Sequence, residues 1–187
     1  ADVAEGRVTR PLDLAGRRLL IAEEGLKTLD GHWFEYDRAV TAANSNAGVE
    51  VAVAAHADVN AAVRDRLNAQ PTFACSSWDG VYNFSSGWRR YLGIARHNRL
   101  VFKSMQRFVR EHGPFDCVFA PTVAIHHIYG WRWFALSELG FSAERLVLLF
   151  RNSIGDYRGG QLTQSRAKRK IWQESLRPLQ ILITQGR

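Results

Sequence analysis

Two adjacent histidines, His126 and His127, directly follow an apolar segment at residues 115–120. Imidazole titrates near neutral pH, so a histidine at the end of a strand can exchange a proton with a bound ligand. The pair is therefore a candidate general base or hydrogen-bonding pair, and a helix-capping or packed pair is the simpler alternative. A metal site would need a third ligand, such as His32 or Glu24, and the sequence has none of the tight ligand spacings of metal sites. We expect no metal.

A second candidate site follows the apolar segment at residues 17–22. Glu24 comes just after this segment, and Gly31 and His32 stand where a helix is expected to begin. Glycine permits close approach of a ligand to the backbone, and a helix N-terminus attracts anions. The alternative is that Gly31 only starts the helix and His32 is solvated. The loop has neither phosphate-binding glycine fingerprint, so we expect no nucleotide cofactor.

A third loop begins at residue 151, after an apolar segment at residues 145–150. Arg151 and Asn152 could bind a polar ligand there, although an ordinary exposed loop has the same composition. The candidate catalytic residues are therefore His32, His126 and His127. The candidate substrate-binding residues are Glu24, Gly31, Arg151 and Asn152.

Short apolar segments alternate along the chain with segments of helical periodicity, which is typical of a parallel sheet covered on both faces. The sequence predicts a doubly wound, Rossmann-like α/β sandwich of three layers with a mainly parallel sheet in the order 3-2-1-4-5-6. We expect residues 1–187 to form one domain, the N-terminal half of a larger protein. The strands are predicted at residues 17–22, 49–55, 72–75, 115–120, 145–150 and 179–184, and the helices at 32–47, 58–68, 88–112, 128–139 and 163–176.

Composition and charge narrow the class of protein. Apolar residues make up 46% of the 187 residues, enough for a sizeable core, and the two cysteines, Cys75 and Cys117, predict buried reduced thiols in a cytoplasmic protein. The net charge is +7, and residues 151–187 hold eight Lys or Arg against two acids. The basic run at residues 166–170 predicts peripheral contact with an anionic inner membrane, and a solvated basic helix face is the simpler alternative. Nothing resembles a nucleic-acid recognition motif.

The first strand, its glycine-bearing loop and the following helix resemble the start of bacterial two-domain glycosyltransferases of the B-type fold. The similarity lies in the segments 19–23 and 30–36, LLIAE and DGHWFEY, and in the fourth strand and its loop at 115–122, FDCVFAPT. It covers about residues 17–152. The family implies an acceptor-binding N-terminal domain and a C-terminal domain that binds a nucleotide sugar, with the reaction between them. It does not imply a metal.

The resemblance gives the first hypothesis for function. The chain would be the acceptor-binding domain of a hexosyltransferase that moves a sugar from a nucleotide-sugar donor to a saccharide or lipid-linked acceptor, as in polysaccharide biosynthesis. Its partner would be the missing C-terminal donor-binding domain, and the isolated domain is expected to be inactive. The second hypothesis is a non-catalytic α/β domain that binds a ligand or a partner protein.

Overall fold

The computed structural model describes residues 14–76, 87–124, 127–141, 143–150, 156–158, 161–163, 169–170 and 173. The five strands of the main sheet are β1 Arg18–Ala22, β2 Glu50–His56, β3 Ala69–Phe73, β4 Cys117–Ala120 and β5 Arg145–Leu148. The helices are α1 His32–Asn46, α2 Ala61–Leu67, α3 Gly87–His112, α4 Ile128–Ala135 and α5 Glu138–Phe141. Two short strands, β6 Asp156–Arg158 and β7 Gln161–Thr163, follow.

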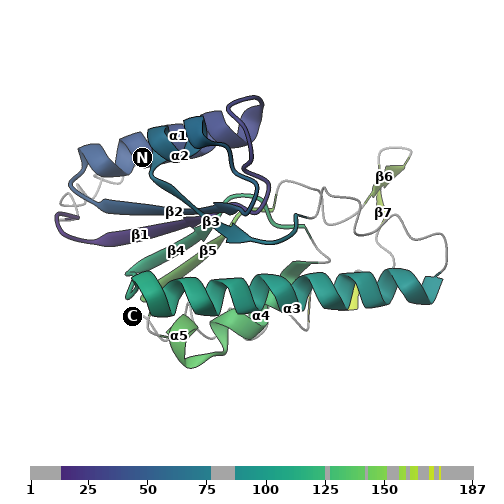
Figure 1. Cartoon of the computed structure of the whole chain (residues 1–187). Helices are drawn as coiled ribbons and strands as arrows, with labels where there is room; N and C mark the ends of the chain where they lie inside the picture. Colours follow the sequence, from purple (N-terminus) through teal and green to yellow (C-terminus); the bar gives the residue numbers. More distant parts are fainter. Residues whose placement is uncertain are drawn as a thin grey trace, which may run out of the picture.

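The five strands are all parallel and lie in the order β3-β2-β1-β4-β5. Figure 1 shows α1 and α2 on one face of the sheet and α3, α4 and α5 on the other. The predicted doubly wound, Rossmann-like α/β fold is thus confirmed, with β1 central between β2 and β4. The predicted sixth strand at residues 179–184 lies outside the described residues.

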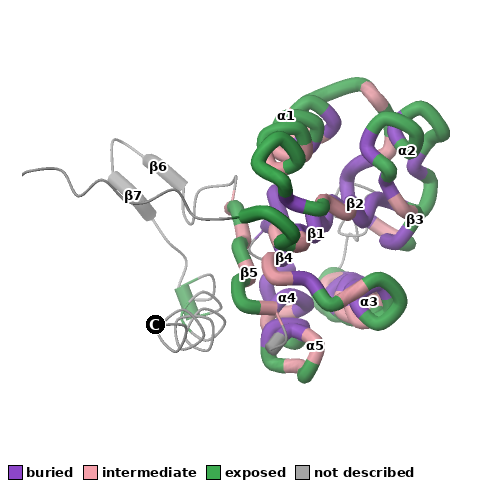
Figure 2. The backbone as a smooth tube through the Cα atoms, turned by 90° about the vertical axis from the view of Figure 1, so that its left-hand side faces the viewer, coloured by how far each residue is buried: buried purple, intermediate pink, exposed green. Residues whose placement is uncertain are grey.

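The central strand is apolar from Leu19 to Ala22, where both of its faces are covered. Leu20 and Ala22 pack into a core beneath α3 and α4, whereas Leu19 and Ile21 pack into a second core beneath α1 and α2. Successive side chains of a strand point to opposite faces, so an uninterrupted apolar run indicates burial on both sides. Figure 2 shows the buried strands enclosed between helices whose outer surfaces are exposed.

The first residues of β1 and β4 are joined at the edge of the sheet opposite the candidate site. The Arg18 backbone N–H donates to Asp116 Oδ2 over 2.7 Å, and Arg17 Nη1 donates to Asp116 Oδ1 over 2.6 Å. These two hydrogen bonds hold the pKa of Asp116 below its usual value. The aspartate that carries part of the family resemblance therefore fixes strand pairing in this structure.

A close contact joins α3 to α4. The Gly130 backbone N–H donates to Asn98 Oδ1 over 2.6 Å, and Asn98 Nδ2 donates to the Ile94 carbonyl over 2.8 Å. A Cβ atom at position 130 would lie 2.8 Å from the Asn98 carbonyl oxygen, so only glycine allows this approach. The contact fixes the start of α4 against the middle of α3.

Several predicted boundaries were wrong. The third strand runs over Ala69–Phe73 rather than 72–75, and it accommodates Pro71 because β3 is an edge strand. The predicted helix at residues 128–139 is two helices, since the Ser137 hydroxyl donates to the Phe134 carbonyl and accepts from the Gly140 N–H. The predicted loop that begins at residue 151 contains β6, which pairs antiparallel with β7.

The predicted inner face of α3 was also wrong at its N-terminal end. Helical spacing predicts Tyr91, Leu92 and Ala95 on the inner face of this helix, but all three are exposed. Gly93, His97 and Asn98 are buried instead, and only from Val101 onward does the inner face carry the expected large apolar residues. Among the described residues, no helix combines the length and the apolarity needed to cross a membrane.

The α3–α4 contact predicts that Gly130→Ala destabilises the domain. The added methyl group must separate two tightly packed helices, which costs about 1–3 kcal/mol. Thermal unfolding should show a Tm several degrees lower. Gly87→Ala is the matched control, because an added Cβ there meets no atom within 4 Å. An equal Tm for both variants would contradict the close contact.

Candidate functional site

Glu24 lies two residues beyond the end of β1, at the carboxyl edge of the sheet. The strand order reverses between β1 and β4, and in open parallel sheets ligands bind outside the strand ends at such a point. His127 follows β4 and immediately precedes α4. His97 comes from the buried face of α3. Three separate elements thus bring one carboxylate and two imidazoles to this edge.

The Glu24 carboxylate lies between the two histidines. Its Oε2 is 3.0 Å from His97 Nε2, and its Oε1 is 3.2 Å from His127 Nδ1. The two imidazole rings are 4.4 Å apart between centroids, with planes tilted by 32°. The three residues are at most 7% exposed. In this buried setting the interactions among them are stronger than they would be in water.

Cys75 extends the cluster on the other side of His97. Its Sγ is 3.3 Å from His97 Nδ1, so both ring nitrogens of His97 face a polar partner. Both cysteines are free, but they are half-buried rather than fully buried as predicted. Cys117 lies in β4 and is not part of this cluster. Burial raises the pKa of its thiol.

His97 is held in its protonated form. Burial by itself favours the neutral ring and would lower its pKa, but the hydrogen bonds to Cys75 and Glu24 and the charge of Glu24 outweigh this effect. Together they raise the pKa of His97 to about 9. At neutral pH the His97 imidazolium therefore faces the Glu24 carboxylate, and its Nδ1–H donates to Cys75 Sγ.

The same three residues, Glu24, His97 and His127, are close enough to share a divalent cation, because their ligand atoms lie within 4.8 Å of one another. A chain of hydrogen bonds accounts for the same distances without an ion. It also agrees with the absence of tight metal-ligand spacing in the sequence. Both arrangements fit these distances, so the expectation of no metal stays a prediction.

The structure brings together two of the predicted site residues, His127 and Glu24. His32 is exposed at the start of α1, where its ring packs on Trp33 with centroids 4.6 Å apart. Gly31 precedes α1 with φ of 93°, a left-handed conformation that favours glycine. His126, Arg151 and Asn152 lie outside the described residues. The predicted cleft shared by His32, His126 and His127 therefore stays a prediction.

Sequence reasoning missed His97 as a site residue. The sequence did contain a sign of this role. His97 and Asn98 lie on the same face of α3 as the apolar residues Val101 and Met105. Polar residues on a buried helix face usually have specific partners. The partners are far away in the sequence, so this signal gives the position without identifying Glu24.

No family model matches the chain, and no curated protein matches it in sequence. What the structure establishes is a Rossmann-like α/β domain with five parallel strands.

The raised pKa of His97 predicts how stability changes with pH. In the unfolded chain a histidine has a pKa of about 6.5, so between pH 6.5 and 9 the folded protein binds more protons than the unfolded protein. The stabilisation is complete below pH 6.5 and is lost as the pH rises through 9, by up to ~3 kcal/mol. Urea unfolding across this range measures the loss. Glu24→Gln should flatten the curve, and identical curves for both proteins would contradict the assignment.

Proposed function

We propose that the chain is the acceptor-binding domain of a glycosyltransferase, with His127 as the group that accepts a proton from the acceptor hydroxyl. The observation that carries the proposal is the buried contact of 3.2 Å between His127 Nδ1 and Glu24 Oε1 at the carboxyl edge of the sheet. A carboxylate that accepts the Nδ1–H of an imidazole fixes its tautomer and leaves Nε2 as the basic nitrogen.

His97 has a separate role in this proposal. As an imidazolium it balances the negative charge of Glu24, so the cluster carries no net charge when His127 is neutral. A second proton on His127 would place two cationic rings 4.4 Å apart between centroids, which disfavours that state at rest. The proposal requires His127 to be neutral, as a general base must be before it reacts.

In an enzyme that inverts the sugar, these roles would give the following step once an acceptor reaches His127 Nε2, which is buried in this structure. His127 Nε2 takes the proton of the acceptor hydroxyl, the acceptor oxygen forms a bond to the anomeric carbon, and the nucleoside diphosphate leaves with the electrons of the broken C–O bond. The resulting His127 imidazolium is stabilised by Glu24. In a retaining enzyme no base is needed, and His127 would only hydrogen-bond the sugar or the donor phosphate.

The donor would be bound by a second domain. The described part of this chain is a Rossmann-like fold whose strand order reverses between β1 and β4. The resemblance of segments 19–23, 30–36 and 115–122 to two-domain glycosyltransferases supports the same proposal. A nucleotide-sugar diphosphate needs a clamp of its own, such as a glycine-rich helix N-terminus or a set of Arg and Lys. The 187-residue chain is therefore expected not to turn over a nucleotide sugar alone.

Replacing His127 tests the proposal in a protein that joins this domain to its donor-binding domain. His127→Gln should lower kcat by about 10²–10⁴-fold, the usual contribution of a general base, with a smaller change in KM. Glu24→Gln should also lower kcat, since it removes the charge that stabilises the His127 imidazolium. His112→Gln, at the exposed C-terminal end of α3, is the matched control and should retain full activity. An unchanged kcat for His127→Gln would exclude a general-base role.

Burial of the cluster favours a second candidate, a non-catalytic domain that binds a ligand or a protein. His97 is fully buried and His127 is 2% exposed, as expected for polar groups that hold a fold together. In that case His127→Gln would lower the free energy of unfolding without affecting any turnover. Saccharide titrations of the 187-residue chain, followed by NMR, would separate the candidates, since only the first requires an acceptor sugar to shift the His127 resonances.

A further inference from the structure

Within residues 1–150, the net positive charge is concentrated on α3. This helix holds seven Lys or Arg and a single acid, Glu111. The remainder of residues 1–150 holds ten Lys or Arg and fifteen Asp or Glu. The net charge of residues 1–150 is therefore close to zero only because one basic helix offsets an excess of acidic residues in the rest of this segment. Such a field attracts an anionic surface to one side of the molecule.

Six of the seven cations form one row along the helix. Successive members are three, four or seven residues apart, which places them on a single side of an α-helix. All six are exposed, and the row is about 32 Å long at 1.5 Å per residue. Within the described part of the chain, none of them forms an ion pair with an acid. The members are Arg89, Arg96, Arg99, Lys103, Arg107 and Arg110.

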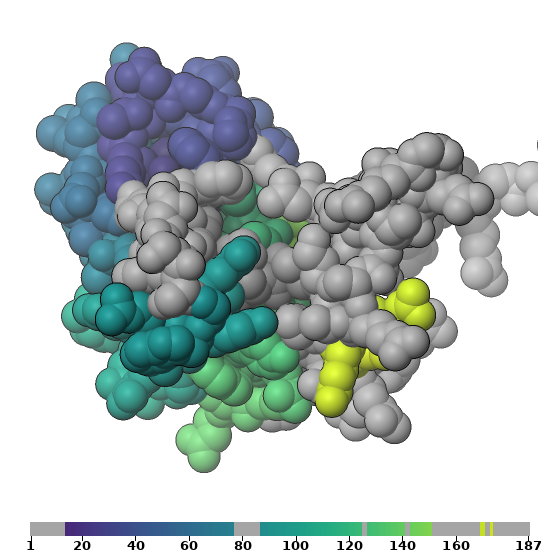
Figure 3. All heavy atoms as spheres, turned by 90° about the vertical axis from the view of Figure 1, so that its right-hand side faces the viewer, coloured from purple at the N-terminus to yellow at the C-terminus, as the bar shows by residue number. Residues whose placement is uncertain are grey.

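The N-terminal end of α3 adds large apolar side chains to this row. Residues 87–92 are all exposed, and in Figure 1 this end of the helix extends beyond the sheet. Trp88 is 63% exposed, Tyr91 73% and Leu92 59%. Figure 3 shows the dark-teal start of α3 at the molecular surface. Three large exposed side chains on adjacent turns are unusual for a surface with no partner.

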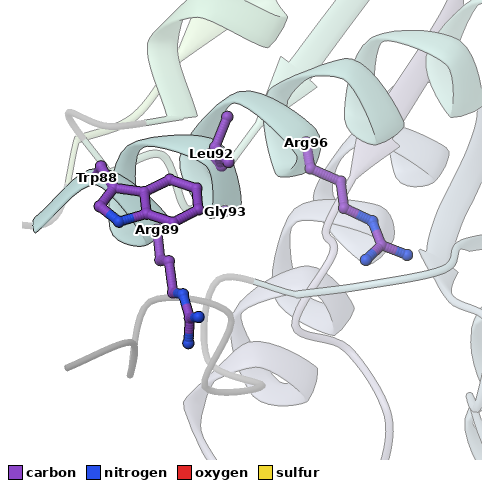
Figure 4. Close-up of a pocket in the computed structure, with 5 residues that line it drawn as sticks. All are labelled: Trp88, Arg89, Leu92, Gly93 and Arg96. Atoms are coloured by element: carbon purple, nitrogen blue, oxygen red, sulfur yellow. The ribbon is translucent and has the colours of Figure 1, made fainter. Parts of the chain in front are cut away.

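A shallow hollow of about 230 Å³ lies among these side chains, lined by Trp88, Arg89, Leu92, Gly93 and Arg96. Figure 4 shows Arg89 and Arg96 extending in the same direction from the helix, two turns apart. The Arg89 guanidinium lies 5.5 Å from the centre of the Trp88 ring. Two guanidinium groups beside an indole and an aliphatic side chain suit a phosphate group at the boundary with hydrocarbon.

We propose that this basic–aromatic face of α3, defined by the six cations with Trp88 and Leu92, binds the surface of an anionic lipid bilayer. The cationic row would lie along the headgroups, and the protruding apolar end would enter the interface. Charge alone would also suit a nucleic acid, but Leu92 beside Trp88 favours hydrocarbon as the neighbour. The inference does not depend on the proposed transferase activity.

The sequence placed the membrane contact at residues 166–170, whose described members, Arg169 and Lys170, are exposed and helical. The row on α3 is longer, is combined with apolar side chains and belongs to a helix packed on the sheet. A helix packed on the sheet presents its charges in fixed positions, which lowers the ordering cost of binding.

Vesicle binding of the 187-residue chain tests the proposal. We expect binding to phosphatidylcholine vesicles that contain about a third phosphatidylglycerol, weaker binding at high salt, and little binding to phosphatidylcholine alone. Arg96→Gln with Arg99→Gln should weaken binding about 30-fold, from roughly fivefold per arginine. Trp88→Ser with Leu92→Ser should remove the part of the binding that survives high salt.

The matched control is Arg64→Gln with Arg66→Gln, which removes the same charge from α2 on the opposite face of the sheet. It should weaken binding much less than the α3 pair. All of these side chains are exposed, so the Tm should change little and folding can be checked directly. Equal loss for the two arginine pairs would overturn the proposal. The protein could instead bind a 30-nucleotide single-stranded nucleic acid more tightly than the vesicles. If the Arg96→Gln, Arg99→Gln variant lost that binding, the face would be assigned to nucleic acid.

Discussion

The carboxylate of Glu24 holds the carboxyl edge of this domain together. Its two oxygens contact His97 on α3 and His127 before α4, so one side chain connects the end of the central strand to two helices. The direct contact between Asn98 and Gly130 sets the spacing of those helices and therefore the 4.4 Å separation of the two rings. A change in the packing of α3 on α4 would alter both histidine–Glu24 distances at once.

A buried chain of charged and polar groups is a poor way to gain stability. Removing Glu24 and His97 from water costs several kcal/mol per ion, and their attraction recovers this only where every partner is well placed. An apolar cluster of the same volume would stabilise a fold at least as well. The arrangement offers instead a histidine with a shifted pKa at the edge where parallel sheets bind ligands, and such groups gather at functional sites.

The fold could be predicted from sequence because its evidence is local. The unbroken apolar runs at Leu19–Ala22 and Val51–Ala55 indicate strands buried on both faces, and alternation with helices fixes a parallel sheet. Glu24 and His127 were identified because strand ends of such a sheet meet at one edge. His97 was missed because its role depends on a contact with residue 24 that no local pattern encodes. The exposed start of α3 was mistaken for core because helical spacing shows which residues share a face but not where a helix leaves the sheet.

The protonation states of the two histidines test the central claim most directly. An NMR spectrum of the imidazole nitrogens at pH 7, with His97→Gln and His127→Gln used for assignment, would observe both rings. The account predicts that His97 carries protons on both nitrogens, whereas His127 is neutral with its proton on Nδ1 facing Glu24. A neutral His97, or a His127 that carries its proton on Nε2, would contradict it.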